Sequence, residues 1–231
     1  MDIDKMNKMG RELIDIFNLD TSPVSISLIP STHDVPEGIQ RLEDPSRHCQ
    51  MIDNVRREGI SFYTFVDDHK CKGGAAAIGL CAMSQSLETG DFYYKLKRFN
   101  TINAARRTMQ QIPVIPPESI KSIVYAPLEK TSLEPDVVVI ISNPEKIMKI
   151  SQSMLYKHGG RVNASFAGIQ SLCADSVAQP YLYGTAGVTI GCSGSRKYTQ
   201  IKDSEMIIGI PAEQLEDLVE AAKKMFPPKA D

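Results

Sequence analysis

The spacing of apolar residues predicts that helices and strands alternate in the first part of the chain. Between residues 6 and 17, apolar side chains recur every three or four positions, as on one face of an amphipathic helix. Residues 24–29 alternate apolar and polar side chains, which is typical of a half-buried strand. Residues 30–45 are polar and contain several prolines, so we expect a loop there.

The same alternation continues through the middle of the chain. We expect a helix over residues 100–111 and a strand over residues 120–128. Residues 136–141 form a near-continuous run of β-branched side chains, which indicates a strand buried on both faces. Asn143 and Pro144 then have the character of an N-cap and a first helical residue, so a helix is predicted to start there.

The C-terminal pattern completes the prediction of the fold. A strand is expected at residues 205–210, followed by a last helix from Pro211 with one apolar stripe. Because helices and strands interleave throughout, the fold class is α/β or α+β, with a mixed β-sheet flanked by helices. We expect a single domain over residues 1–231.

Composition narrows the class of protein. The 231 residues are 42% hydrophobic and 23% charged, which is ordinary for a globular protein. No apolar run approaches the roughly 18 residues that span a bilayer, so no membrane partner is expected. The N-terminus lacks the basic start and apolar core of a signal peptide, which favours a cytoplasmic location.

One basic segment raises the question of nucleic-acid binding. Residues 95–107 carry only basic charges and have aromatic residues nearby, a combination found in proteins that bind single strands. The formal net charge of the whole chain is −2, however, which favours a solvated helix face instead. Nucleic acid is therefore not expected as a partner.

Four of the five cysteines form two similar pairs. Cys49 lies in a polar, helix-like stretch, and Cys71 opens a Cys-Lys-Gly-Gly turn after a strand-like run. Cys173 lies in a second helix-like stretch, and Cys192 opens a Cys-Ser-Gly turn after another strand-like run. The repeated order suggests an internal duplication, with similar halves at residues 20–90 and 135–210. An odd number of cysteines without an export signal predicts reduced thiols rather than disulfides.

The two turns have chemistry suited to a bound group. The glycines Gly73, Gly74 and Gly194 let backbone N–H groups approach closely, at the positively polarised start of a helix. Such N–H groups donate to cluster sulfides or to an anionic ligand. Arg196, at the end of the second turn, could hold a carboxylate or phosphate bidentately, or could be a plain surface arginine.

The spacing of the cysteines leaves other interpretations open. The chain has no Cys-x-x-Cys motif, so only folding can bring the four thiols together. Free cysteines also pack as small hydrophobic residues, an alternative that is strongest for Cys173, and Cys81 is expected to be structural. His48 and His69 lie near two of the cysteines and could instead be ligands or proton carriers.

The two turn motifs also resemble those of a known family. The segments Cys71-Lys72-Gly73-Gly74 and Gly191-Cys192-Ser193-Gly194-Ser195-Arg196, with Pro135-Asp136, Cys173 and Ile210-Pro211, resemble the domain-of-unknown-function family 169. The resemblance extends from about residue 10 to residue 226. This family occurs in methanogenic archaea and anaerobic bacteria. The resemblance brings no assigned reaction, but it implies an anaerobic cytosol in which iron–sulfur clusters survive.

These observations give one leading hypothesis and several alternatives. We expect an iron–sulfur protein of unknown reaction with one [4Fe–4S] cluster; if only three cysteines bind it, the fourth iron would be open to a small anionic or sulfur-containing ligand. The alternatives are a thiol-dependent enzyme with Cys192 or Cys71 as nucleophile, a non-catalytic module that binds an anion or small molecule, and a structural zinc site. The expected metal ligands are Cys49, Cys71, Cys173 and Cys192, and the expected cofactor-binding residues are Gly73, Gly74, Gly194 and Arg196.

Overall fold

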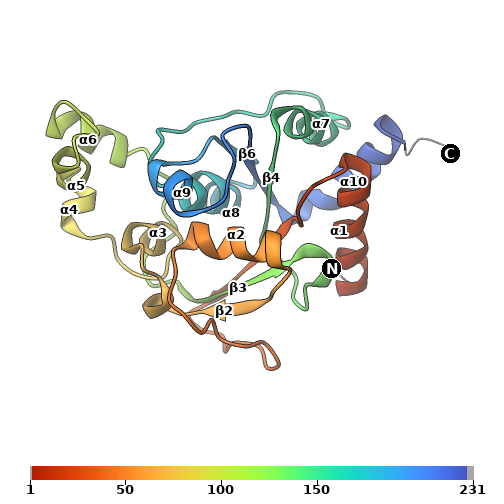
Figure 1. Ribbon diagram of the computed structural model, residues 1–231, viewed down its shortest axis with the longest axis horizontal. Coiled ribbons are helices and arrows are strands. Elements are labelled where there is room, and N and C mark those ends of the chain that lie inside the picture. The colour runs from red at the N-terminus through yellow and green to blue at the C-terminus, as the bar shows by residue number, and fades with distance from the viewer. Residues whose placement is uncertain (1, 228–231) are drawn as a thin grey trace.

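The computed structural model describes residues 2–227, in which one six-stranded sheet is flanked by helices (Figure 1). The strands run in the order β2-β3-β1-β4-β6-β5, and neighbouring strands are antiparallel. Parallel pairing is confined to isolated bridges, Arg41 with Tyr63 and Ser46 with His69. The predicted class, a sheet flanked by helices that interleave with its strands, is confirmed, but the sheet is antiparallel and not the expected mixture of parallel and antiparallel strands. The strands are β1 Val24–Pro30, β2 Phe62–Thr64, β3 Ile120–Pro127, β4 Val137–Ser142, β5 Gly187–Thr189 and β6 Met206–Pro211.

Most of the helices in the described part of the chain are short. The α-helices are α1 Ile3–Phe17, α2 His48–Glu58, α3 Lys72–Ala77, α4 Gln85–Glu88, α5 Asp91–Lys95, α6 Ile102–Met109, α7 Pro144–Leu155, α8 Gln179–Tyr183, α9 Ser193–Tyr198 and α10 Leu215–Met225. The segment η3, Ser171–Ala178, is a π-helix. Single 3₁₀ turns form η1 Val66–Asp68, η2 Leu128–Lys130 and η4 Ala212–Gln214. No helix in residues 2–227 is long and apolar enough to cross a membrane.

The sheet separates two hydrophobic cores, and β4 contributes to both. Val137, Val139 and Ile141 pack with residues of α2, α3 and η3, whereas Val138 and Ile140 pack with α1, α7 and α10. The β-branched run thus forms a strand buried on both faces, as predicted. Asn143 caps α7 by accepting the backbone N–H of Lys146 at 2.9 Å, with Pro144 as the first helical residue, which is also as predicted.

Two expectations are wrong, one about the burial of the first strand and one about the start of the last helix. Residues 24–28 are buried on both faces rather than half-buried, because β1 lies in the middle of the sheet between β3 and β4. Ser25 satisfies its buried hydroxyl by donating to the carbonyl of Ala126 at 3.0 Å. The last helix begins at Leu215 rather than Pro211, because Pro211 still pairs with Val137 in the β4–β6 ladder.

The strands follow an equivalent order from each edge of the sheet to its centre. From edge to centre the order is β2-β3-β1 in one half and β5-β6-β4 in the other. In each half the chain makes a central strand, a cysteine-bearing helix, an edge strand, a helix capped by cysteine and then the intermediate strand. This is the order on which the duplication hypothesis rests, and the duplication itself stays a prediction. The intermediate strand of the first half, β3, lies beyond residue 90.

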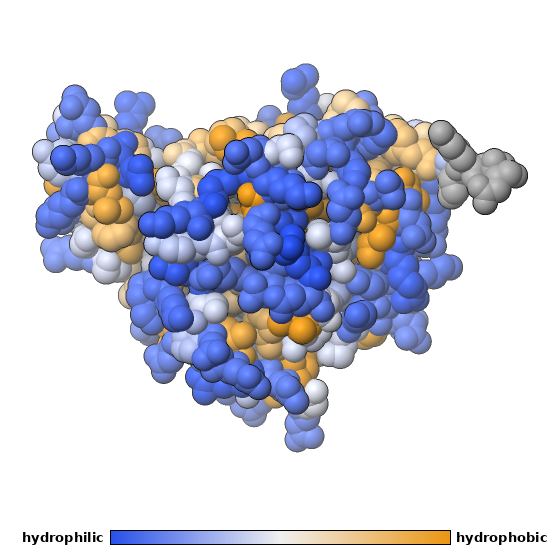
Figure 2. Space-filling model, in the orientation of Figure 1, coloured by the Kyte–Doolittle hydropathy of each residue, from blue (hydrophilic) through white to orange (hydrophobic). Residues whose placement is uncertain are grey.

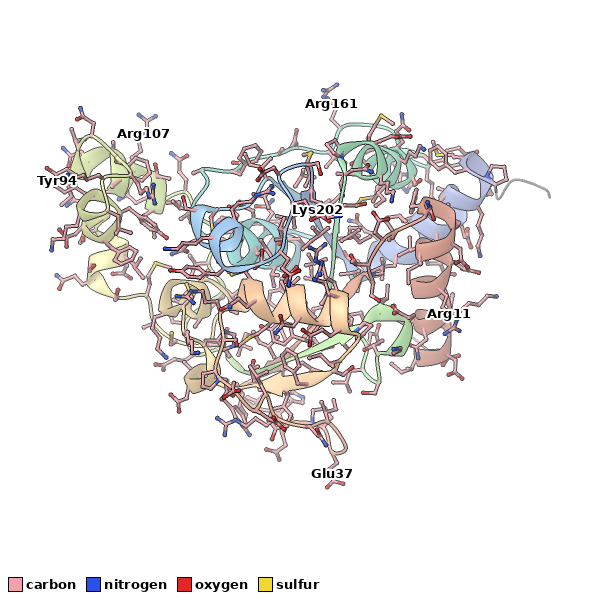
Figure 3. All side chains as sticks on the ribbon, viewed as in Figure 1. Arg11, Glu37, Tyr94, Arg107, Arg161 and Lys202 are labelled. Carbon is pink, nitrogen blue, oxygen red and sulfur yellow. The ribbon has the colours of Figure 1, made fainter. Side chains whose placement is uncertain are left out.

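Helices α4, α5 and α6 form a lobe at one end of the molecule (Figure 1). A small apolar cluster of Leu87, Met109 and Ile169 joins the lobe to the rest of the structure. The lobe exposes apolar side chains beside hydrophilic ones, visible as orange among blue in Figure 2. Tyr94 and Arg107 point away from the body of the protein (Figure 3). The basic residues of segment 95–107 are solvent-exposed.

Candidate functional site

Four cysteines lie in the first turns of four helices that pack against one another. Cys71 is the N-cap of α3 and Cys192 is the N-cap of α9. Cys49 is the second residue of α2, and Cys173 is the third residue of η3. Helix α2 contacts both η3 and α9, and α3 contacts η3. The fold therefore brings the predicted cysteines of both halves to one side of the sheet, where Figure 1 places α2, α3 and α9 together.

The thiols are close enough to change one another's acidity. Burial raises the pKa of Cys49 to about 12, and the thiols of Cys192 and Cys71 contribute to that shift. Burial also raises the pKa of Cys173, with further contributions from Cys71, Cys192 and Cys49. Charges act on one another over about 10 Å in ordinary salt. We therefore consider Cys49, Cys71, Cys173 and Cys192 together and call this set the thiol group. In contrast, the pKa of Cys81, which burial raises, responds to Lys72 and Glu118.

Glycines leave space beside the sulfur atoms of both turns. A Cβ atom on Gly74 would lie 3.5 Å from the Sγ of Cys71 and 3.8 Å from the Cβ of Cys173. A Cβ atom on Gly194 would lie 3.6 Å from the Sγ of Cys192. Neither glycine has a positive φ, so backbone strain does not require glycine at these positions. What glycine provides here is room next to the thiols.

The described residues contain no preformed site for a single metal ion. Within residues 2–227, no three histidine, cysteine, aspartate or glutamate side chains are grouped closely enough to hold one ion. The electrostatic influence among the four thiols is therefore not accompanied by a set of ligands around one point in that part of the chain.

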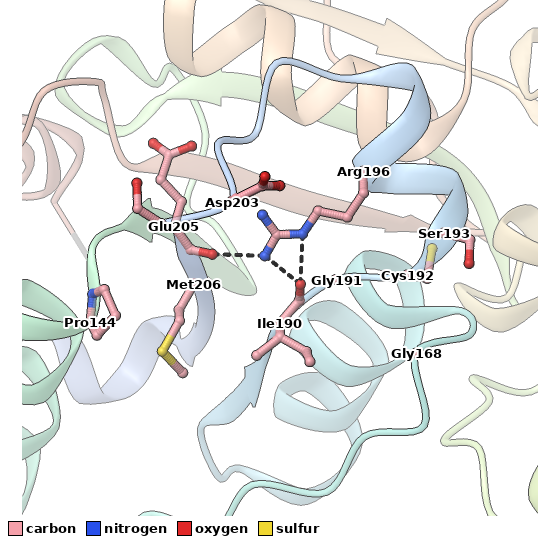
Figure 4. Close-up of a pocket in the computed structure, with 11 residues that line it drawn as sticks. Pro144, Gly168, Ile190, Gly191, Cys192, Ser193, Arg196, Asp203, Glu205 and Met206 are labelled. Carbon is pink, nitrogen blue, oxygen red and sulfur yellow. Dashed lines mark hydrogen bonds between the residues drawn. The ribbon is translucent and has the colours of Figure 1, made fainter.

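Arg196 is held by the backbone rather than facing the thiols. Its Nε donates to the carbonyl of Ile190 at 2.9 Å, and its Nη2 donates to the carbonyl of Glu205 at 2.8 Å (Figure 4). Its Nη1 donates to the carbonyl of Lys202. The guanidinium thus ties the loop after β5 to the start of β6. Because most of its donors are used in this way, the geometry favours a structural arginine over the predicted anion clamp.

An open pocket of about 620 Å³ lies beside the Cys192 turn. Its walls include Cys192, Ser193 and Arg196 on one side and Glu205 and Met206 on the other (Figure 4). The pocket gives small molecules access to the Cys192 turn. Among the four cysteines, Cys192 lines this pocket and Cys71 is exposed, whereas Cys173 is buried.

A buried ion network, which the sequence analysis missed, fixes α2 against the second half. Arg56 donates to Asp53 at 2.7 Å and to Glu205 at 3.1 Å, and its side chain is only 1% exposed. The other oxygen of Asp53 accepts the backbone N–H of Gln200 at 2.8 Å. The only signal in the sequence was the spacing of Asp53 and Arg56, three residues apart on one helix. The network positions Cys49 relative to the loop that follows α9.

The two candidate histidines belong to a buried polar layer next to the thiols. His48 Nδ1 lies 2.7 Å from the hydroxyl of Tyr125, and His69 Nε2 lies 3.0 Å from the hydroxyl of Thr64. Burial lowers the pKa of His48 to about 3 and that of His69 to about 4, so both rings are neutral at neutral pH. Burial raises the pKa of Tyr125, with contributions from Cys173 and Cys49.

The π-helix that carries Cys173 packs directly on glycines of the sheet. A Cβ atom on Gly187 would lie 1.7 Å from the carbonyl oxygen of Asp175, and one on Gly209 would lie 1.9 Å from that of Ser176. Both distances are far too short for real atoms, so glycine is required for this approach. The Asp175 carboxyl accepts the hydroxyl of Thr189 at 2.9 Å, and burial raises its pKa to about 7.

Comparison with known proteins places this site in a family without an assigned reaction. Residues 12–221 match the model of DUF169, which is described as uncharacterised ArCR. The chain belongs to this family. It is also similar to "Uncharacterized protein MJ0308" of the archaeon Methanocaldococcus jannaschii, with 41% identity over 222 residues, covering 96% of this chain and 95% of the relative. No solved structure matches the chain.

Proposed function

We propose that the protein binds one [4Fe–4S] cluster through Cys49, Cys71, Cys173 and Cys192. The observation that carries the proposal is the convergence of these four thiols, from both halves of the chain, on one side of the sheet. A bound cluster would supply one-electron chemistry, and if only three of the cysteines bind it, the open fourth iron would add a Lewis-acid position for a small anionic or sulfur-containing ligand. An anaerobic cytoplasm is the proposed setting.

A cluster tolerates a wider spacing of its thiol ligands than a single ion does. Around one zinc ion, four sulfurs share a centre at about 2.3 Å and must nearly touch. In a cluster each thiolate binds a different iron atom, so the ligands stand farther apart. The four cysteines influence one another electrostatically without forming a single-ion group within residues 2–227. The glycines Gly74 and Gly194 leave space beside the sulfur atoms of Cys71 and Cys192.

The acidity of the buried thiols argues against Cys49 and Cys173 as nucleophiles and is compatible with metal ligation. With raised pKa values, Cys49 and Cys173 hold their protons at neutral pH. A reactive nucleophile needs the opposite shift, towards the thiolate. Iron displaces the protons when it binds, so a raised thiol pKa is compatible with a ligand and makes binding depend on pH. The helix starts around the thiols contribute partial positive charge that favours the thiolate form once the proton has left.

The decisive experiment is anaerobic purification, followed by absorption spectroscopy and by iron, sulfide and zinc analysis. We expect a brown protein with about four irons and four sulfides per chain and a broad absorption band in the blue. Zinc in place of iron, or a colourless metal-free protein after anaerobic reconstitution, would contradict the proposal.

Cysteine variants assign the ligands. Replacing Cys49, Cys71, Cys173 or Cys192 by serine should each remove most of the iron or convert the cluster to a form with fewer irons. Cys81→Ser is the matched control and should retain the wild-type iron content, because Cys81 lies outside the thiol group. Equal iron loss in all five variants would indicate misfolding rather than ligation.

Cys192 also has a feature that favours a second candidate function, a thiol nucleophile. The backbone N–H of Ser195 donates to the Cys192 sulfur at 3.4 Å, and the adjacent pocket is open to solvent. A donated hydrogen bond stabilises a thiolate. If this function is right, metal-free protein should be alkylated by iodoacetamide at Cys192 much faster than at Cys81 near neutral pH. Equally slow labelling of all five cysteines would exclude it.

A further inference from the structure

The lobe formed by α4, α5 and α6 leaves large apolar side chains in solvent. Phe92 is 43% exposed and Leu96 is 50% exposed. The two residues are four positions apart, on α5 and at its C-cap, so they lie on one face of this helix. The small apolar core of the lobe is built from other residues. Exposed apolar side chains that gather in one place mark interaction surfaces.

The same lobe concentrates positive charge. Segment 95–107 contains five basic residues and no acidic one, in a chain with a formal net charge of −2. Lys95 is paired with Asp91 at 2.6 Å. A concentration of unpaired cations attracts a negatively charged partner. Three basic side chains of the segment are exposed and form no hydrogen bond or ion pair within residues 2–227: Lys97, Arg98 and Arg107.

Lys97 has a backbone conformation that favours glycine. Its φ is +54°, in the left-handed region. The backbone N–H groups of Lys97 and Arg98 donate to the carbonyls of Tyr94 and Tyr93, which closes the end of α5. Glycine is the usual residue at this position of a helix end. The chain instead places a charged, exposed side chain there, directly after Leu96, and such a residue points to a function.

The lobe directs its outer side away from the body of the protein. It projects from one end of the molecule (Figures 1 and 2), and Tyr94 and Arg107 point outward (Figure 3). Its inner side is close to the thiol group, because burial raises the pKa of Tyr93 on α5 and three cysteines of that group add to the shift. A partner bound to the lobe is therefore held near the thiol group.

We propose that the outer side of the lobe docks a partner protein that presents an apolar groove with an acidic rim. Phe92 and Leu96 fill the groove, and Lys97, Arg98 and Arg107 pair with carboxylates on its rim. An apolar centre, a polar rim and a high content of aromatic residues and arginine are usual features of protein interfaces. The inference does not rest on the proposed iron–sulfur cluster.

Two features favour a protein over a single-stranded nucleic acid as the partner. Proteins that bind single strands hold the strand in a positively charged groove and stack its bases on aromatic rings. The lobe instead projects from the molecule (Figure 1), and Leu96 has no ring on which a base could stack. A projecting apolar side chain fits a groove in a protein partner, as in the recognition of amphipathic helices.

The test uses the full-length protein and a fluorescent synthetic peptide, an amphipathic helix with leucine on one face and glutamate on the other. Fluorescence anisotropy measures its binding. We expect binding to the wild type that weakens as the salt concentration is raised. Leu96→Ser, and the double variant Lys97→Glu with Arg98→Glu, should each weaken binding by about tenfold.

Matched substitutions outside the lobe are the controls. Ile60→Ser changes an apolar side chain of similar exposure, 41%, and should leave binding unchanged. The double variant Lys70→Glu with Lys130→Glu reverses two exposed lysines and should also leave it unchanged. Lys97→Gly guards against misfolding, because glycine relieves the left-handed strain. It should be at least as stable as the wild type and still bind the peptide more weakly.

Three results would overturn the inference. The first is no binding of the acidic peptide, and the second is equal binding by the wild type and all lobe variants. The third is binding of a single-stranded oligothymidylate, lost in the lobe variants, without binding of the peptide, which would assign the lobe to nucleic acid. The proposed cluster is judged separately, by the iron and sulfide content of the purified protein.

Discussion

The two halves of the molecule bring their cysteines to the same place by different packing. In the first half, Cys49 lies on α2, an amphipathic α-helix in which only the last two residues, Arg57 and Glu58, are exposed. In the second half, Cys173 lies on η3, a π-helix with every residue buried. Long π-helical segments are rare and are frequently found at functional sites. The same position in the sheet topology can thus hold an α-helix or a π-helix.

The difference follows from what lies beneath each helix. Strands β5 and β6 present Gly187 and Gly209 to η3, and this allows the helix backbone to approach the sheet directly. Helix α2 instead packs side chains such as Met51, Ile52 and Val55 against the core. The second half fixes its cysteine by close backbone contact, whereas the first half does so by side-chain packing and the Arg56 ion network. The two halves should therefore respond to different perturbations.

The largest effect on stability is expected from Gly209→Ala. This substitution disrupts the close backbone contact between η3 and the sheet, which occurs in the second half. A Cβ atom 1.9 Å from the Ser176 carbonyl cannot be accommodated without moving η3. We expect a loss of about 5 kcal/mol in the free energy of unfolding, or no folded protein. Urea unfolding followed by circular dichroism measures it. Gly74→Ala, whose new methyl makes only ordinary contacts, is the control, and an equally stable Gly209→Ala would refute the packing argument.

The next largest effect is expected from Arg56→Met, which breaks the contact between the halves. The substitution leaves Asp53 and Glu205 without their buried cation, at an expected cost of about 4 kcal/mol in the free energy of unfolding. Arg57→Met, at the neighbouring exposed position, should change stability by less than about 0.5 kcal/mol. Equal unfolding midpoints in urea for the two variants would show that the network contributes little.

The contributions of the two halves to stability should depend on pH in opposite directions. The second half buries a carboxylic acid, Asp175, whereas the first half buries two histidines, His48 and His69. The folded-state pKa of Asp175, about 7, is above its usual value of 3.8, so its contribution to stability is present in acid and is lost as pH rises through 7. The pKa values of His48 and His69, about 3 and 4, are below their usual 6.5, so their contribution is lost as pH falls from 6.5 through 4.

The pH prediction is tested on metal-free protein with Asp175→Asn. Between pH 5 and pH 8 the wild type should lose on the order of 3 kcal/mol more stability than this variant, measured by urea unfolding. Both proteins should share a loss of stability as pH falls from 6.5 through 4, because both retain the two buried histidines. Parallel stability curves above pH 5 would show that the Asp175 carboxyl is ionised in the folded protein.

The smallest effect on stability, but a specific one on the site, is expected from Gly74→Ala. Alanine favours the helix by up to about 1 kcal/mol, so the free energy of unfolding should be unchanged or slightly raised. The new methyl would fill the space beside Cys71 and Cys173, so the iron content after reconstitution should fall. Gly194→Ala should do the same beside Cys192. Full iron content in both variants would show that the glycines do not make room for the cluster.

Several elements could be predicted from local sequence because their causes are local. The β-branched run of β4 and the Asn143–Pro144 start of α7 need only backbone sterics and a cap. The turns at Cys71 and Cys192 were expected at helix starts, and both cysteines are N-caps. Family membership also followed from the turn motifs. The expected role of Arg196 could not be settled in this way, since its partners are carbonyl groups that the loop brings into reach only after folding.

The sequence by itself determined which residues are the candidates for the chemistry: two cysteine pairs, each with a cysteine at a glycine turn. Only the tertiary structure decided that these four cysteines lie at the starts of helices on one side of the sheet, because residues far apart in the chain become neighbours through strand pairing and helix packing. It also decided that the Cys173 helix is a π-helix that packs directly on Gly187 and Gly209. That packing depends on how closely a buried backbone approaches the sheet, and periodicity along one segment carries no information about that distance.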